Sequence, residues 1–186
     1  MSSTAVPHAW EALSLDWLPA DSELPKVALQ PGELHIARDP AMLQTILGSC
    51  VGVTFWSRRL GVGALCHGVL PGSSRQSRAA SILSEGGRYV DFSIRYLARQ
   101  FDALGVDRRE LEVKVFGGAD VLLSAVRDPS RTVGAQNRRA ALEALAEEGL
   151  TALASDVGGQ NGRVVHFNTR TGEVLVRRLA SASALP

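Results

Sequence analysis

LGSCVGVTFWSRRLGVGALCHGVLP, residues 47–71, is the stretch that decides the fold of this chain. It contains two runs rich in β-branched and aliphatic residues, 51–56 and 61–70, with the four residues 57–60 between them. Two apolar runs around a short polar loop predict a β-hairpin. The same stretch holds both cysteines of the chain and one of its four histidines. The pairing of the two strands therefore decides whether a thiol meets an imidazole.

A loop of residues 57–60 fixes which side chains oppose one another across the hairpin. In that register Cys50 lies directly opposite His67, with Cβ atoms about 4.5–5.5 Å apart. A free thiol is largely protonated at neutral pH and needs a base to become a nucleophile. We therefore expect Cys50 to be a nucleophile and His67 its base, as a thiolate–imidazolium pair. A loop of three or five residues would instead put His67 on the opposite face.

The other face of the hairpin is wholly apolar and is expected to face the core. Its members are Val51, Val53, Phe55, Val62, Ala64 and Cys66. Successive strand residues point to opposite faces, so Cys66 cannot easily share a metal ion with His67. We therefore expect neither a metal site nor a cofactor.

The face that carries Cys50 is rich in glycine, at Gly52, Gly61 and Gly63. A surface without side chains allows another protein segment to approach closely, so we expect this face to be open to a substrate. Gly52, Gly63 and Ser49 are the candidate substrate-binding residues. Ser49 is also an alternative nucleophile, although strand alternation would point it away from Cys50.

An inert cysteine beside a structural histidine is the main alternative for this pair, because it is the commoner fate of such residues. The other histidines, His8, His35 and His166, have no acidic or thiol neighbour in sequence, and we expect them to be structural or exposed.

Further strands and two helices are expected from the hydrophobic periodicity of the rest of the chain. The strands are 34–37, 42–47, 111–115, 150–157, 164–167 and 173–179. The helices are 90–104, ended by Gly105, and 135–148, stopped by Gly149. Short turns join most strands, so the expected class is α+β, with a mixed, mainly antiparallel sheet and two main helices.

One globular domain is the expectation for 186 residues of which 45% are hydrophobic. Residues 1–31 show no sustained period of either kind, so we expect an N-terminal extension that is partly ordered at most. The domain is then 32–180, followed by a short tail, 181–186.

The charge balance is nearly neutral, with 20 basic and 19 acidic residues and a formal net charge of +1. This provides no broad basic field, so we expect no nucleic-acid partner. No apolar run approaches the ~20 residues of a membrane span, and the first twenty residues lack the apolar segment of a signal peptide. We therefore expect a cytoplasmic protein without membrane insertion, whose cysteines are reduced.

An ordered series of motifs makes the chain resemble the CheD family of chemoreceptor glutamine deamidases. The motifs are TILGSCVGV (45–53), HGVLP (67–71), VFGGA (115–119), VGAQN (133–137), DVGGQNGR (156–163) and TGEVLVRRL (171–179). They span roughly residues 32–179, nearly the whole expected domain. The resemblance implies an α/β/β sandwich.

The resemblance also implies a cytoplasmic enzyme that hydrolyses side-chain amides of selected glutamines on chemoreceptors, leaving glutamates that can be methylated. It assigns the nucleophile to Cys50, the base to His67, and the orientation of His67 to Thr45. The implied partners are the cytoplasmic domains of chemoreceptors and a chemotaxis phosphatase. The long N-terminal extension and the Ser/Arg-rich segment 71–85 depart from the family pattern and bear on substrate choice.

Two other functions remain open at this stage. A non-catalytic chemotaxis adaptor could bind receptors or a phosphatase through the same glycine-rich face. A thiol protease or a transglutaminase could use the same cysteine and histidine.

Overall fold

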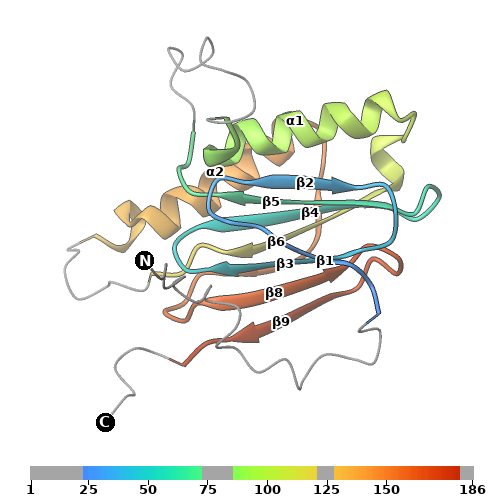
Figure 1. Ribbon diagram of the computed structural model, residues 1–186. Helices are drawn as coiled ribbons and strands as arrows, with labels where there is room; N and C mark the ends of the chain where they lie inside the picture. Colours follow the sequence, from blue (N-terminus) through green and yellow to red (C-terminus); the bar gives the residue numbers. More distant parts are fainter. Residues whose placement is uncertain (1–22, 73–85, 121–127, 181–186) are drawn as a thin grey trace, which may run out of the picture.

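The computed structural model describes residues 23–72, 86–120 and 128–180 (Figure 1). Within these ranges the chain forms nine β-strands in two sheets, and two α-helices. The strands are β1 (Lys26–Ala28), β2 (Leu34–Ala37), β3 (Met42–Leu47), β4 (Val51–Ser57), β5 (Val62–Gly68), β6 (Leu111–Gly117), β7 (Ala152–Val157), β8 (Arg163–Asn168) and β9 (Val174–Arg178). The helices are α1 (Val90–Ala103) and α2 (Val133–Glu147).

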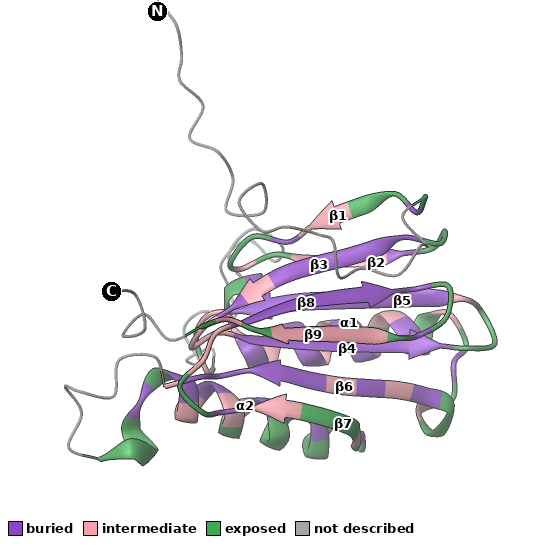
Figure 2. Cartoon of the chain, turned by 90° about the horizontal axis from the view of Figure 1, so that it is seen from below, coloured by how far each residue is buried: buried purple, intermediate pink, exposed green. Residues whose placement is uncertain are grey.

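The elements are stacked in three layers, which Figures 1 and 2 show from two directions. The helices cover one face of a five-stranded sheet of order β2-β5-β4-β6-β7. The other face of that sheet packs on a four-stranded sheet of order β1-β3-β8-β9. Most neighbouring strands are antiparallel, and each sheet has one parallel pair, β1 with β3 and β6 with β7. The expected α/β/β sandwich is confirmed.

The apolar face of the β4–β5 hairpin packs against the helices, as the sequence predicts. All six of its side chains, Cys66 among them, belong to one buried cluster with residues of α1 and α2. Phe55 stacks on Phe101 of α1, with ring centroids 6.0 Å apart. Gly105 and Gly149 follow the two helices with φ of 71° and 67°, a left-handed backbone that ends a helix easily only at glycine.

The register of the hairpin differs from the predicted one by two residues. Ser57 pairs with Val62, so the loop is 58–61, and His67 lies opposite Gly52 rather than Cys50. Gly61 explains the shift, because its φ of 65° lets the chain turn there and donate its N–H to the Ser57 carbonyl at 2.9 Å. A shift of two residues keeps every side chain on its predicted face.

The glycine-rich face is not open, and that expectation is wrong. It forms the interface between the two sheets, where a Cβ added to Gly63 would lie 2.7 Å from Cγ2 of Thr169. Trp56, on the same face, is buried and donates its indole N–H to the Thr169 carbonyl at 2.8 Å. Figure 2 shows most of β3 and all of β4, β5 and β8 coloured as buried. The glycines therefore allow close approach of a sheet, not of a substrate.

Strand β1 was not predicted, because three residues are too short to show a period. It pairs in parallel with β3 at the edge of the four-stranded sheet. Leu24 and Leu29, on either side of it, are buried, and Leu29 donates its N–H to the Gln44 carbonyl at 2.8 Å. The folded sheet therefore starts at Lys26, inside the segment that the sequence assigned to the extension, whose residues 1–22 lie outside the described ranges.

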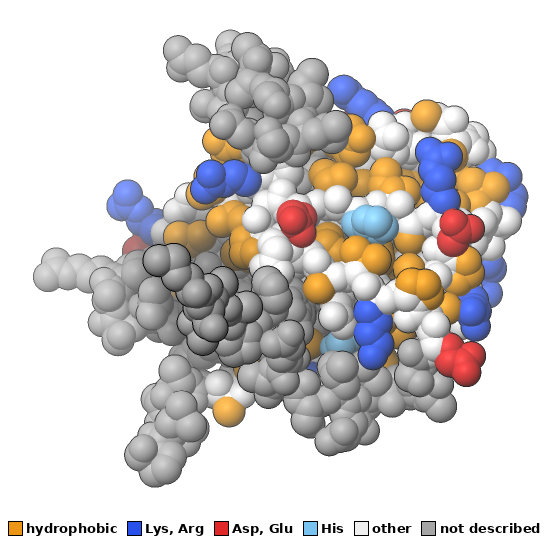
Figure 3. Space-filling model, viewed as in Figure 1, with side chains coloured by type: hydrophobic (Ala, Val, Ile, Leu, Met, Phe, Trp, Pro, Cys, Tyr) orange, Lys and Arg blue, Asp and Glu red, His pale blue; other side chains and the backbone are white. Residues whose placement is uncertain are grey.

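Charged side chains of both signs are interspersed among apolar ones on the face shown in Figure 3, in keeping with the formal net charge of +1. Neither α1 nor α2, nor any shorter helix in the described ranges, has the length and apolar character to cross a membrane.

Two truncations test the contribution of β1. A chain that starts at residue 30 loses β1 together with Leu24 and Leu29, and burial of each leucine is worth about 1.5–3 kcal/mol. Its melting temperature should lie about 10 °C or more below that of a chain that starts at residue 23. Equal melting temperatures in thermal unfolding followed by circular dichroism would contradict this role for β1.

Candidate active site

Cys50 lies in a tight bend, residues 48–50, between β3 and β4, and it is half-buried. Every carbonyl oxygen of this bend accepts a hydrogen bond, from Ala119 N to Gly48 (2.8 Å), Asn137 Nδ2 to Ser49 (2.9 Å) and Gly118 N to Cys50 (2.7 Å). Gly117 approaches so closely that a Cβ there would lie 2.3 Å from the Cys50 oxygen. The bend is therefore held rigidly by the segment after β6 and by α2.

His67 is almost fully buried on β5, and it meets Thr45 of β3 across the interface between the sheets. Its Nδ1 lies 2.7 Å from the Thr45 hydroxyl oxygen, which also lies 3.0 Å from the Leu29 carbonyl. A carbonyl only accepts, so the single hydroxyl proton goes to Leu29 and the hydroxyl oxygen accepts from His67. This assigns the ring proton to Nδ1 and leaves a lone pair on Nε2.

The Nε2 atom of His67 is buried and has no hydrogen-bond partner among the described residues. An unpaired buried acceptor is costly, at about 1–3 kcal/mol, so its retention needs an explanation. A base that must receive a proton during a reaction meets this description, because its lone pair has to be free in the resting state.

Burial keeps both candidate catalytic groups uncharged. It lowers the pKa of His67 to about 4, against smaller raising effects of the Leu29 backbone and the Glu33 charge. Burial also raises the pKa of the Cys50 thiol, against a lowering effect of its own backbone N–H. At neutral pH these shifts favour a thiol and a neutral imidazole over the expected thiolate–imidazolium pair.

The remaining sequence candidates are buried or face away from Thr45, except Ser49, which lies beside Cys50. Gly52 and Gly63 are buried between the sheets, which removes them as substrate contacts. Cys66 is 1% exposed, and burial raises its pKa to about 12, so it is an inert core residue. His166 pairs with Gln44, and it therefore faces away from Thr45 on its sheet. Ser49 is half-buried beside Cys50, with its carbonyl bound by α2.

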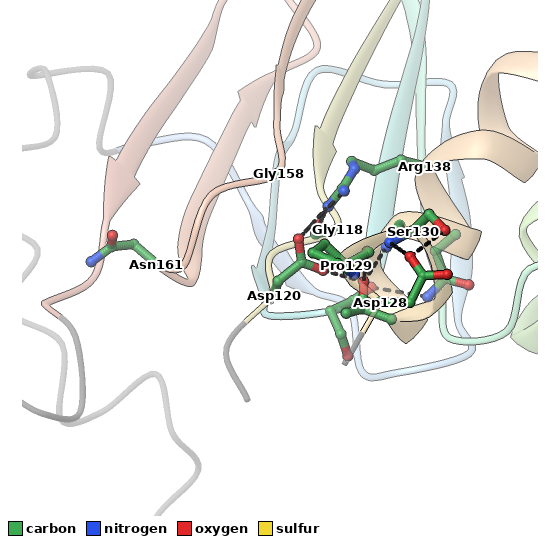
Figure 4. Close-up of polar contacts among 12 residues, drawn as sticks. Gly118, Asp120, Asp128, Pro129, Ser130, Arg138, Gly158 and Asn161 are labelled. Carbon is green, nitrogen blue, oxygen red and sulfur yellow. Dashed lines mark hydrogen bonds and ion pairs between the residues drawn. The ribbon is translucent and has the colours of Figure 1, made fainter. Parts of the chain in front are cut away.

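Sequence reasoning missed a polar network around Arg138 and Asp120, which Figure 4 shows, next to the segment that binds the Cys50 bend. Arg138 of α2 donates to the Gly118 carbonyl and pairs with Asp120 at 3.4 Å. Asp120 in turn donates its backbone N–H to the Gly159 carbonyl at 2.7 Å, and Gly158 donates to Gly117 at 2.9 Å. These residues come from the motifs at 115–119, 133–137 and 156–163 and from positions next to them. The motifs that carry the family resemblance were therefore the one sequence signal that could have pointed to this network.

A second ion pair ties the loop after β7 to the two sheets. Arg163 of β8, with its side chain 3% exposed, donates to Asp156 at 2.8 Å and to the Gly158 carbonyl at 2.7 Å. Although burial opposes it, hydrogen bonds from Arg178 and Arg163 hold the pKa of Asp156 below its usual value. Within the described residues, no three His, Cys, Asp or Glu side chains lie together in an arrangement that could hold a metal ion.

The chain is similar to a series of known proteins. The sequence model of a family described as "CheD chemotactic sensory transduction" matches residues 69–178. The "Probable chemoreceptor glutamine deamidase CheD 2" of Geobacter sulfurreducens is 42% identical over 87% of this chain and 95% of its own length. Proteins named "Probable chemoreceptor glutamine deamidase CheD" from Oleidesulfovibrio alaskensis (40% identical over 88% of this chain and 77% of theirs) and Maridesulfovibrio salexigens (38%, 85% and 94%) follow. Alignments of this extent necessarily include positions 50 and 67.

Alkylation of Cys50 tests the uncharged resting pair. The rate of iodoacetamide labelling should rise with pH through a pKa above the ordinary 9.0, since the thiol is neutral below it. His67→Ala should slow labelling near pH 7, because the base is lost, and leave the rate at high pH unchanged. Rapid, pH-independent labelling of the wild-type protein between pH 5 and 7 would instead indicate a thiolate–imidazolium pair. Mass mapping should show Cys66 unlabelled.

Substitution of Thr45 tests its orienting role. Thr45→Val keeps the shape of the side chain but removes the acceptor for His67 Nδ1–H, so the ring loses its fixed tautomer. We expect the turnover rate on a glutamine substrate to fall about 100-fold with little change in KM, which is the scale of general acid–base catalysis. Thr45→Ser, which keeps the hydroxyl, is the matched control and should stay near the wild-type rate. A fully active Thr45→Val protein would refute the role.

Proposed function

Because the chain belongs to the CheD family, we propose that it is a protein-glutamine deamidase that converts glutamine side chains of chemoreceptors to glutamates. The observation that carries the proposal is the buried, neutral His67, held by Thr45 with its Nε2 unpartnered among the described residues. The residues that follow Cys50 and His67, Val51 and Gly68, pair with each other across the hairpin. A thiol nucleophile and a free imidazole base are the two groups that hydrolysis of a carboxamide through an acyl-enzyme requires.

In the first half-reaction, Cys50 Sγ attacks the side-chain carbonyl carbon of glutamine while His67 Nε2 takes the thiol proton. The carbonyl oxygen becomes an oxyanion, for which the backbone N–H of Cys50, a group that acts on the thiol, is the candidate donor. The C–N bond then breaks, and the leaving ammonia takes the proton from Nε2. A thioester between Cys50 and the former glutamine side chain remains.

In the second half-reaction, water attacks the thioester and gives a proton to His67 Nε2. The C–S bond breaks, the sulfur regains its proton from the imidazolium, and glutamate is released. The sum is a carboxamide and water converted to a carboxylic acid and ammonia. His67 Nε2 serves both transfers. Its pKa of about 4 makes the imidazolium return its proton readily, while it opposes the uptake of that proton from the thiol.

The surface around the Cys50 bend is where a receptor segment would dock, since the glycine-rich face is closed. Two exposed apolar side chains lie on the segments that Asn137 links to this bend, Leu70 (36% exposed) and Val133 (50%). Leu70 follows Val69, whose carbonyl binds Asn137, and Val133 precedes Asn137 by one helical turn. Apolar groups beside a polar reaction centre suit an amphipathic protein segment that presents a glutamine.

The setting of this reaction is the cytoplasm, with receptor cytoplasmic domains as substrates and a chemotaxis phosphatase as a second partner. A phosphatase that covers the Cys50 bend would exclude receptors by occupying the same surface. The alternative function, a non-catalytic adaptor, uses the same contacts without turnover.

Intact mass of a receptor cytoplasmic fragment tests the function. Each deamidation should add about 1 Da, because an amide nitrogen is replaced by oxygen in a reaction that needs an activated thiol. Cys50→Ala should abolish the change, and Cys66→Ala with normal stability should retain it. A receptor fragment that binds the wild-type protein but keeps its mass would favour the adaptor, and an active Cys50→Ala protein would remove Cys50 as the nucleophile.

A further inference from the structure

Asn137 of α2 bridges the two segments that carry the catalytic candidates. Its side chain is fully buried, and Nδ2 donates to the carbonyl of Ser49 at 2.9 Å and to the carbonyl of Val69 at 3.0 Å. Ser49 directly precedes Cys50, and Val69 follows His67 by two residues. One amide group therefore fixes the Cys50 bend relative to the end of β5.

The hydrogen bond to Ser49 also sets the direction of a donor in the site. The Ser49 carbonyl and the Cys50 N–H belong to one trans peptide plane, in which C=O and N–H point in opposite directions. A partner that holds the carbonyl toward α2 therefore holds the N–H away from α2. That N–H belongs to the residue whose sulfur attacks, so it is close to the place where an oxyanion would form.

An amide suits the chemistry of this buried position. Two carbonyl acceptors need two protons from one side chain, and the –NH₂ group of asparagine supplies both, which also fixes which end of the amide is nitrogen. Its Oδ1 is buried and has no hydrogen-bond partner among the described residues. An unpaired acceptor costs about 1–3 kcal/mol, so stability alone does not account for this residue.

We propose that Asn137 is a positioning residue that aims the backbone N–H of Cys50 at the oxyanion and fixes Cys50 relative to His67. The inference rests on the proposed deamidation, and it assigns a task to the motif at 133–137 that the Cys50, His67 and Thr45 assignments leave without one.

Kinetics on a receptor fragment separate positioning from general loosening. In Asn137→Ala the turnover rate should fall about 100-fold with KM within a factor of about 3, the scale reported for loss of one oxyanion donor. Iodoacetamide labelling at a pH above the thiol pKa should keep its wild-type rate, because displacement at a saturated carbon forms no oxyanion. Asn137→Ser keeps one proton donor, so its turnover rate should lie between those of the wild-type protein and of Asn137→Ala. It replaces the alanine variant in the test if that variant is unstable.

Gln136 supplies the matched control. It precedes Asn137 on the same helix and also donates a side-chain amide to a backbone carbonyl, that of Arg131 at 2.8 Å, but on the surface. Gln136→Ala should leave turnover, labelling and melting temperature unchanged. Wild-type turnover in Asn137→Ala, or equal losses of turnover and of labelling at high pH, would overturn the proposal.

A spectroscopic readout keeps the inference independent of the activity. Selective ¹⁵N-cysteine labelling gives two amide signals, because the chain has two cysteines. Asn137→Ala should shift or broaden the Cys50 signal and leave that of Cys66 in place, whereas Gln136→Ala should change neither. If the wild-type protein deamidates nothing, the proposed function fails, yet an unmoved Cys50 signal is still what overturns the positioning role.

Discussion

The hydrogen bond between Thr45 and His67 crosses from one sheet to the other, so it exists only where the two sheets pack face to face. The sheets can come that close because Gly52 and Gly63 present no side chains to the interface, where an added Cβ would meet atoms at 2.9 Å and 2.7 Å. The Leu29 carbonyl, supplied by the segment after β1, accepts the Thr45 hydroxyl proton and completes the chain of hydrogen bonds. The packing of the two sheets therefore also fixes the geometry of the Thr45–His67 pair.

Burial accounts for the protonation state of the site, between the sheets for His67 and in the half-buried bend for Cys50. Removal from water disfavours the charged form of either group, which raises the pKa of Cys50 and lowers that of His67. A preformed thiolate would react with any electrophile that reached it, whereas a neutral thiol becomes nucleophilic only as His67 withdraws its proton. The arrangement thus restricts the chemistry to substrates that fit the Cys50 bend.

Much of the fold could be predicted from the sequence. The period-two pattern of a strand shows which face of the sheet each side chain lies on, even where the predicted pairing of residues across the hairpin is wrong. Cys66 was placed in the core correctly although the hairpin register was wrong by two residues, since a shift of two preserves the face. The glycine-rich face was misjudged, because glycine equally permits approach of a substrate or of a second sheet. Only the packing of β8 on β5, which joins residues far apart in the sequence, shows that a second sheet approaches these glycines.

The support of the Cys50 bend shows why the candidate site was less predictable than the fold. Asn137 donates to the carbonyl of Ser49, 88 residues away in sequence, and no local sequence pattern predicts such a hydrogen bond. Yet all three carbonyls of the bend are bound by residues of the segment after β6 or of α2, and that binding restricts the peptide planes between them. Donors fixed in this way need no reorganisation when charge develops, which is the condition under which they lower a barrier most. The motifs at 115–119 and 133–137, which are far apart in sequence, therefore hold the same bend in place.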